Sequence, residues 1–145
     1  MTLIDAYGLV ALVADEPAAS DVETLLRAGA CRVVAMNLAE AVDVCQRVHG
    51  ISTADVRSAL EPLTLSGTLA VAVSREPEAW LAAEVRATHY HAKDCPLSLA
   101  DCFLLAHALS DGDALATSDP DLARTANAEG AVVVGLPDTA GNIPA

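Results

Sequence analysis

The sequence has 145 residues, enough for one domain with a single core, and its 20 acidic against 8 basic residues give a net charge of −12. This charge excludes the usual basic face of nucleic-acid-binding proteins, so contact with nucleic acid would need metal ions and individual arginines. The start of the sequence lacks a basic signal-peptide region, and no apolar stretch is long enough to span a membrane. We therefore expect a soluble, cytoplasmic protein.

The first half of the sequence alternates short apolar runs with amphipathic ones. Asp5 stands where the first strand becomes the first helix, and its side chain could cap that helix. Asn37 is a second predicted cap, and Pro62 is expected to bend its helix or end it early. The pattern predicts strands over 2–5, 32–36 and 69–73, and helices over 6–14, 18–28, from Asn37 onward, and over 53–65.

The second half continues the alternation. Ser98 is placed to cap a helix that Gly112 ends, with further helices predicted over 77–92 and 122–129 and strands over 114–117 and 131–134. Residues 1–135 are expected to form the domain and 136–145 a loosely ordered tail. Such alternation predicts an α/β fold with three layers, α/β/α, around a mainly parallel sheet of about four to five strands.

Four acidic residues are predicted to meet at one edge of this sheet. Asp5, Glu40 and Asp119 follow strands directly or within a few residues, and in parallel sheets sites form beyond the carboxyl ends of the strands. Asp101 lies on the apolar stripe of its helix, where an unpaired carboxylate is rare. Crowded carboxylates repel one another unless a cation lies among them, and hard oxygen ligands favour Mg²⁺ or Mn²⁺ over Zn²⁺.

Three of these acids also have a purely structural interpretation, and the residues alone leave both open. Asp5 and Asp119 could be simple helix caps, since Asp119 is followed by Pro120 at the first helical position. Asn37 and Glu40 together form a variant of the capping box.

Four segments of the sequence resemble PIN-domain nucleases, and within that family the VapC-type toxins of bacterial toxin–antitoxin systems. The resemblance extends from residue 2 to about 134 and is carried by Leu3-Ile4-Asp5-Ala6-Tyr7, Asn37-Leu38-Ala39-Glu40, Leu97-Ser98-Leu99-Ala100-Asp101 and the segment 116–123. It implies that Asp5, Glu40, Asp101 and Asp119 surround Mg²⁺ or Mn²⁺. Thr117 resembles a hydroxyl that helps to position metal or water, and Asp121 could share or take over the fourth acidic role.

The resemblance also implies an activity and partners. The activity would be metal-dependent endoribonuclease hydrolysis that leaves a 5′-phosphate and a 3′-hydroxyl. The partners would be a second copy of the chain and a VapB-like antitoxin whose basic arm covers the acidic site, for which the charge of −12 is suited. No residue in the sequence decides between RNA and DNA.

Two other functions compete with this one. A Mg²⁺-dependent phosphatase or phosphoacceptor domain would also place Asp5 at the end of the first strand, but the phosphatase pattern Asp-x-Asp is broken by Tyr7. A non-catalytic interaction module could keep the fold without the activity, although all four acids are present.

Overall fold

The structure is a computed structural model that describes residues 1–145. Its centre is a five-stranded sheet in which every pair of neighbouring strands is parallel, in the order β3-β2-β1-β4-β5. This confirms the predicted α/β class and parallel sheet. The strands are β1 (Thr2–Ile4), β2 (Cys31–Val34), β3 (Leu69–Ala72), β4 (Ala114–Thr117) and β5 (Val133–Gly135).

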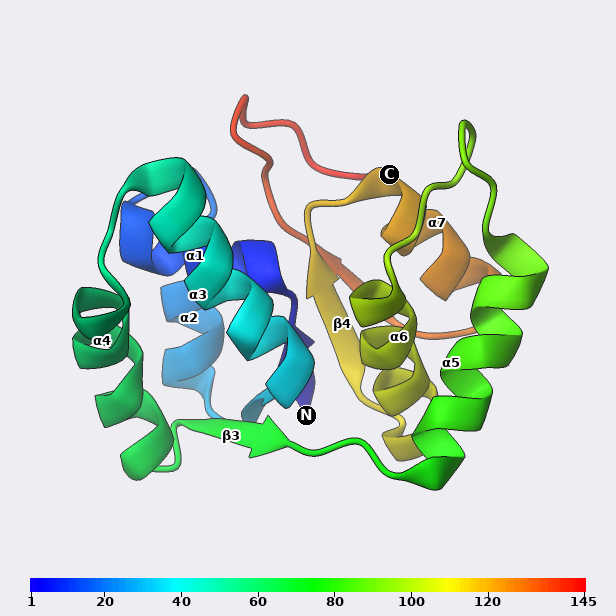
Figure 1. Ribbon diagram of the computed structural model, residues 1–145, viewed down its shortest axis with the longest axis horizontal. Coiled ribbons are helices and arrows are strands. Elements are labelled where there is room, and N and C mark those ends of the chain that lie inside the picture. Colours follow the sequence, from blue (N-terminus) through cyan, green and yellow to red (C-terminus); the bar gives the residue numbers. More distant parts are fainter.

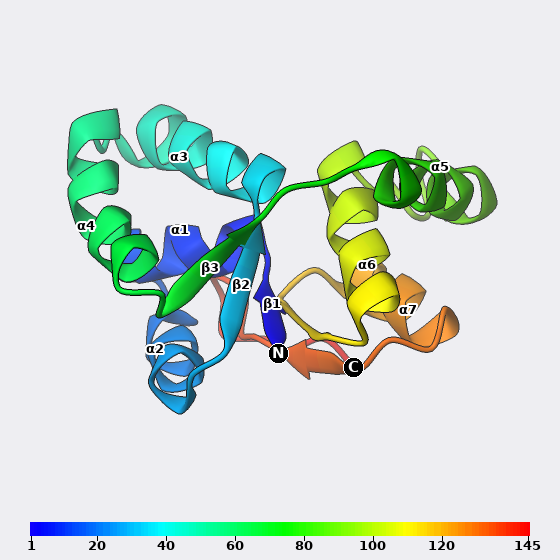
Figure 2. The same cartoon turned by 90° about the horizontal axis from the view of Figure 1, so that it is seen from below.

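Seven helices cover the two faces of the sheet. Helices α1 to α4 lie on one face and α5 to α7 on the other, which gives the expected three layers (Figures 1 and 2). None of the helices is both long and apolar enough to cross a membrane. The helices are α1 (Ala6–Ala14), α2 (Ala19–Ala28), α3 (Ala35–His49), α4 (Thr53–Leu65), α5 (Glu76–His89), α6 (Leu99–Asp111) and α7 (Pro120–Ala128).

Each face of the sheet has its own apolar core. Successive strand residues point to opposite faces, so Ile4 and Ala116 pack under α1 to α4, whereas Leu3 and Leu115 pack under α5 to α7. All four of these residues are fully buried. The two central strands, β1 and β4, therefore hold the two helical layers together.

The predicted start of the third helix is wrong. Helix α3 begins at Ala35, directly after β2, and its N-cap position, Val34, makes no side-chain cap. Ala35 and Met36, which the pattern assigned to a strand, are both good helix formers, and the helix takes them up as its first two residues. Asn37 consequently lies inside the first turn and is fully buried.

Helix α4 spans Thr53–Leu65, as predicted, and Pro62 does not end it early, because a proline one turn from the end removes only one late hydrogen bond. One helix end differs from expectation. Helix α5 ends at His89 instead of Ala92, since Tyr90 adopts an extended conformation with ψ 128°.

The residues after β5 pack against the domain over part of their length. Leu136 is fully buried in the core under α1 to α4, and its N–H donates to the Thr117 carbonyl at 2.8 Å. The carboxylate of Asp138 accepts from the backbone N–H groups of Ala140 and Asn142, at 2.8 Å each, which closes a turn.

Candidate functional site

A pocket rich in carboxylates lies where the strand order changes direction. From β1 the strand order runs through β2 to β3 in one direction, whereas β4 and β5 lie on the opposite side of β1. Ligands of such sheets bind beyond the carboxyl ends of the strands, where the order reverses. The cavity measures about 250 Å³, and no Lys or Arg lines it. Its walls are Asp5, Ala6, Tyr7, Val10, Glu40, Val44, Ser98, Asp101, Ser118 and Asp119. The four acids predicted to share a rim therefore do so.

Asp5 is the most buried of the four acids. It follows β1 and caps α1, where one carboxylate oxygen accepts from the Gly8 N–H at 2.7 Å. A β-carbon at Gly8 would lie 2.6 Å from Ile4 Cγ2 and 3.3 Å from that same Asp5 oxygen, so glycine permits the close approach. Asp5 is only 5% exposed, and its pKa is raised from 3.8 to about 6, chiefly by burial.

Asp101 opens α6 and is tied to Ser98. The Ser98 hydroxyl caps the helix by accepting from the Asp101 N–H at 3.0 Å, as predicted. In return the Asp101 carboxylate accepts from the Ser98 N–H at 3.0 Å and from its hydroxyl at 2.6 Å. This reciprocal capping box gives Asp101 a structural role that the helical pattern did not reveal. Burial nevertheless raises its pKa, with Asp119 adding to the effect.

Glu40 reaches the pocket from the second turn of α3. Because that helix begins at Ala35, Glu40 is not part of a capping box, and its carboxylate makes no hydrogen bond or ion pair within the protein. Burial raises its pKa, and the negative charges of Asp101 and Asp43 raise it further. The capping interpretation of Asn37 and Glu40 is thereby replaced by an unpaired acid facing a pocket.

Asp119 caps α7 with one of its two oxygens. Oδ1 accepts from the N–H groups of Asp121 and Leu122 at 2.7 and 3.2 Å, which leaves Oδ2 without a donor from the protein. Thr117, fully buried beneath the pocket, accepts from the Asp119 N–H at 3.0 Å, and its hydrogen bond to Asp5 lowers the pKa of that acid. Asp121 does not line the pocket, because its carboxylate pairs with Arg124.

The four carboxylates form one electrostatic group around Asp101. The charge of Asp101 raises the pKa values of Asp5 and Glu40, and the charge of Asp119 raises the pKa of Asp101. No cation of the chain offsets this repulsion within the pocket. Repulsion among the carboxylates disfavours the ionisation of all four, and their ionisation becomes favourable when a positive charge enters the pocket.

The donor set of the pocket fits a hard divalent cation. Carboxylate and hydroxyl oxygens are available, whereas no His or Cys lines the cavity, which favours Mg²⁺ or Mn²⁺ over Zn²⁺. The carboxylates surround the cavity without closing into a metal cage, since no three Asp, Glu, His or Cys side chains are grouped tightly enough to hold an ion as they stand. Asp5, Glu40, Asp101 and Asp119 would hold the ion.

Asn37 is a further polar group beside this site that the sequence did not single out for chemistry. It lies one helical turn before Glu40, is fully buried, and neither its amide oxygen nor its amide nitrogen has a partner. Buried polar groups are almost always paired, so an orphaned amide near a binding pocket calls for an explanation. Tyr7, whose hydroxyl is likewise buried and unpaired, lines the pocket itself.

The sequence of the chain matches the PIN domain family over residues 2–128. The chain belongs to the PIN-domain family. This confirms the resemblance drawn from the four sequence segments, and the five-stranded parallel sheet with its three layers is the fold expected for a PIN domain. No curated protein has a significantly similar sequence.

Several solved structures share the fold at low sequence identity. A VapBC2 structure from Rickettsia felis, bound to a DNA fragment from its promoter, superposes with a TM-score of 0.68 and 14% identity, covering 92% of this chain and 96% of that one. FitAcB from Neisseria gonorrhoeae gives 0.62 and 20%, with coverage of 92% and 96%. A toxin–antitoxin complex from Klebsiella pneumoniae gives 0.60 and 19%, with coverage of 82% and 87%.

Proposed function

We propose that this PIN-domain protein is a Mg²⁺- or Mn²⁺-dependent endoribonuclease and the toxin of a toxin–antitoxin pair. The observation that carries the proposal is the pocket in which four carboxylates, from four separate segments of the chain, meet without a cation. A structural cluster of acids would be expected to include a Lys or Arg, because burial of like charges is otherwise unfavourable.

The chemistry would divide between the ion and the chain. When bound, the divalent ion supplies a Lewis acid that polarises a phosphodiester and lowers the pKa of a water molecule. Glu40 is the one unrestrained ligand, because Gly8 N–H holds Asp5, Ser98 holds Asp101 and the first N–H groups of α7 hold Asp119. Thr117 joins Asp5 to the Asp119 backbone and so fixes their relative position. The expected products are a 5′-phosphate and a 3′-hydroxyl.

The alternative functions are weakened by the same pocket. A phosphoacceptor domain uses a carboxylate that receives the phosphoryl group, yet both Asp5 and Asp119 are partly engaged as helix caps, and Tyr7 occupies the position of the second phosphatase Asp. A non-catalytic PIN module would have no need to keep Glu40 unpaired and half-buried.

The proposed regulatory partner is an antitoxin with a basic arm. Three structural neighbours carry toxin–antitoxin names, and an arginine entering the pocket would offset the repulsion among its carboxylates. The net charge of −12 would steer such an arm toward the protein. We also infer from the resemblance that the chain forms a homodimer.

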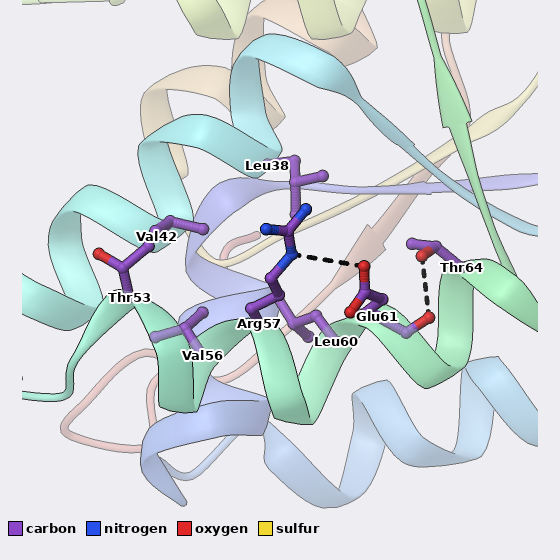
Figure 3. A pocket seen from close by; sticks show the side chains of 8 residues that line it. All are labelled: Leu38, Val42, Thr53, Val56, Arg57, Leu60, Glu61 and Thr64. Carbon is purple, nitrogen blue, oxygen red and sulfur yellow. Dashed lines mark hydrogen bonds and ion pairs between the residues drawn. The ribbon is translucent and has the colours of Figure 1, made fainter.

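A second hollow, an apolar groove between α3 and α4, offers the antitoxin a binding surface. Leu38 and Val42 of α3 face Val56 and Leu60 of α4 across a groove of about 300 Å³, and Arg57 extends over it while pairing with Glu61 (Figure 3). Glu40 and Val44 line the acidic pocket and follow Leu38 and Val42 by two residues each, so the groove and the pocket lie on different sides of α3. An antitoxin with an apolar helix seated in the groove would need a following basic arm that passes around α3 to the carboxylates.

The experiment that tests the nuclease proposal is cleavage of total cellular RNA with Mg²⁺ or Mn²⁺ against EDTA. The wild type is compared with Asp5→Ala and Asp101→Ala proteins whose fold is verified by circular dichroism. Metal-dependent cuts that vanish in both variants support the proposal, and end-group analysis checks the products. Equal cleavage by the variants and the wild type would overturn the nuclease proposal. A wild type that binds Mn²⁺ but cleaves no RNA would favour the non-catalytic interaction module.

A synthetic peptide tests the partner. A peptide with an apolar helical half and an arginine-containing half is expected to bind the wild type and to inhibit cleavage. Binding should weaken in the Asp101→Asn variant, which removes a negative charge from the pocket, and at high salt. Unchanged affinity in that variant would argue against an arm that reaches the carboxylates. The homodimer is tested by light scattering, with twice the chain mass of 14.9 kDa expected.

A further inference from the structure

The cations of the protein are almost all neutralised by its own acids. Six of the seven arginines pair with carboxylates, and the seventh, Arg86, is half-buried. Lys93, the single lysine, is exposed and makes no ion pair. It is therefore the one exposed side-chain cation of the chain that is free to meet an external anion. The paired arginines are Arg27, Arg32, Arg47, Arg57, Arg75 and Arg124.

Lys93 stands at the tip of a closed loop between α5 and α6. The backbones of His91 and Cys95 exchange two hydrogen bonds of 2.9 and 3.0 Å, which pinch the base of the loop. The tip projects beyond the helices on the side toward which β4 points, and this is the carboxylate side of the sheet (upper right in Figure 1). The free cation is thus presented on the same side as the pocket.

Tyr90 begins this loop and presents an aromatic ring. The guanidinium carbon of Arg86 lies 4.3 Å from the ring centroid, which braces one face of the ring. The residue is still 44% exposed. A ring held from one side and open on the other is a ready platform for stacking, because little conformational freedom is lost when a flat ligand binds to it.

Arg86 also connects Tyr90 to the wall of the pocket. Its guanidinium donates a hydrogen bond to the Leu97 carbonyl while it packs on the Tyr90 ring. The next residue, Ser98, lines the pocket and holds Asp101. One guanidinium therefore separates the stacking platform from the backbone that carries the carboxylate site.

We propose that Tyr90 and Lys93 form a contact for single-stranded RNA beside the carboxylate pocket, with a base stacked on Tyr90 and a phosphate held by Lys93. The inference rests on the proposed nuclease function for its substrate. Single-stranded RNA is favoured over a duplex because only unpaired bases can leave their neighbours to stack on a side chain. It is favoured over the basic antitoxin arm because Lys93 would repel such an arm.

The test measures the affinity of a fluorescein-labelled mixed-sequence 12-mer RNA by anisotropy in Mg²⁺, in an Asp101→Asn background that prevents cleavage. Tyr90→Ala should weaken binding about five- to a hundredfold, and Tyr90→Phe should preserve it, since stacking needs the ring and not the hydroxyl. Lys93→Gln should weaken it several-fold and reduce the slope of log affinity against log salt by about 0.7. The matched control Arg27→Gln, an exposed but paired cation, should change neither.

Three outcomes separate this inference from the nuclease proposal. Metal-dependent cleavage by the wild type, together with normal RNA binding and cleavage by the Tyr90→Ala and Lys93→Gln variants, overturns the inference and leaves the nuclease standing. No cleavage, with RNA binding that depends on both residues, supports the contact and overturns the nuclease. Binding of a duplex 12-mer that depends on Lys93 but not on Tyr90 overturns the stacking role.

Discussion

The amino and carboxyl edges of the sheet, where its parallel strands begin and end, treat acids in opposite ways. At the amino edge, Asp111 and Asp113 share the guanidinium of Arg32, at 2.7 and 2.8 Å, and this pairing lowers the pKa of Asp111. At the carboxyl edge, Asp5, Glu40 and Asp101 meet no cation, and their pKa values are raised. The chain neutralises its structural acids internally. Those at the other edge have no cation of the chain beside them, which is what the proposed metal site requires.

The largest effect is expected from removing the internal cation. Arg32→Met should lower the free energy of unfolding by about 3 kcal/mol, because Asp111 would lose its guanidinium partner and Asp113, only 6% exposed, would keep only the N-terminal ammonium at 3.1 Å. Urea unfolding measures the change. The control Arg27→Met breaks an exposed pair with Glu23 and should cost less than about 0.5 kcal/mol. A loss as small for Arg32 would mean that the amino edge does not depend on its cation.

The carboxyl edge should respond to pH with the opposite sign from an ordinary ion pair. Because the pKa of Asp5 rises from 3.8 to about 6 on folding, its stabilising contribution is complete below pH 3.8 and disappears as the pH rises through 6. In EDTA at pH 8, wild type should therefore be less stable than Asp5→Asn by roughly 3 kcal/mol. At pH 4 the two should be nearly equal.

Thermal unfolding from pH 4 to 8 gives this difference directly. Saturating Mn²⁺ at pH 8 should stabilise the wild type more than the Asp5→Asn variant, because a ligand of the native state adds stability by mass action. For Asp111 the sign is reversed, because its pKa is lowered on folding. Its ionised carboxylate stabilises the fold at pH values above its ordinary pKa of 3.8, and this stabilisation is lost as the pH falls into the acid range. A pH-independent difference between wild type and Asp5→Asn would contradict the shift.

A smaller effect on folding, but a large one on activity, is expected at Glu40. Glu40→Gln should reduce metal-dependent cleavage about a hundredfold, as loss of one preorganised charged group typically does. Its free energy of unfolding in EDTA should not fall, because the carboxylate has no partner to lose. Asp43→Asn is the matched control on the same helix, and its exposed pair with Arg47 predicts cleavage within about twofold of wild type. Equal losses from both variants would point to general charge instead of a ligand.

The smallest effect concerns Asn37. Asn37→Leu should raise the free energy of unfolding by about 1 kcal/mol, because it removes two buried atoms that have no hydrogen-bond partner. Thr125→Val is the control, since that buried hydroxyl donates to the Asp121 carbonyl at 2.8 Å and its loss should cost about 1 kcal/mol. Chemical denaturation compares the two variants. If Asn37→Leu is destabilising too, the amide has a partner in solution, such as a water beside the carboxylates.

Local signals in the sequence were enough to predict most of the fold. The strand 114–117 and the helix 6–14 were predicted with their observed bounds, and the caps Ser98 and Asp119 act as expected. The alternation of strands and helices predicted the parallel sheet, and position after a strand brought the four acids to one edge. These features depend on a few neighbouring residues and on the geometry of parallel sheets.

What the sequence did not reveal depends on contacts across the fold. The start of α3 at Ala35 was missed because no side chain caps it, and the strand-like run gave no stop signal. The pairing of Arg32 with Asp111 spans 79 positions, and no local pattern predicts it. The orphaned amide of Asn37 could be recognised only after the helix start was known, because in the predicted helix Asn37 was the N-cap, whose side chain accepts from the backbone.

The placement of β1 between β2 and β4 also bears on how the protein is made. Strand β1 is synthesised first, yet one of its two partners, β4, begins more than a hundred residues later. Asp119 follows β4, so a ribosome-bound chain that still holds this strand back lacks both the sheet contact that supports Asp5 and the last carboxylate. Domains fold as their segments emerge, and pairing between distant strands comes late. The site is thus completed late in translation, once β4 and Asp119 have emerged, when only α7 and β5 of the domain's helices and strands are still to follow.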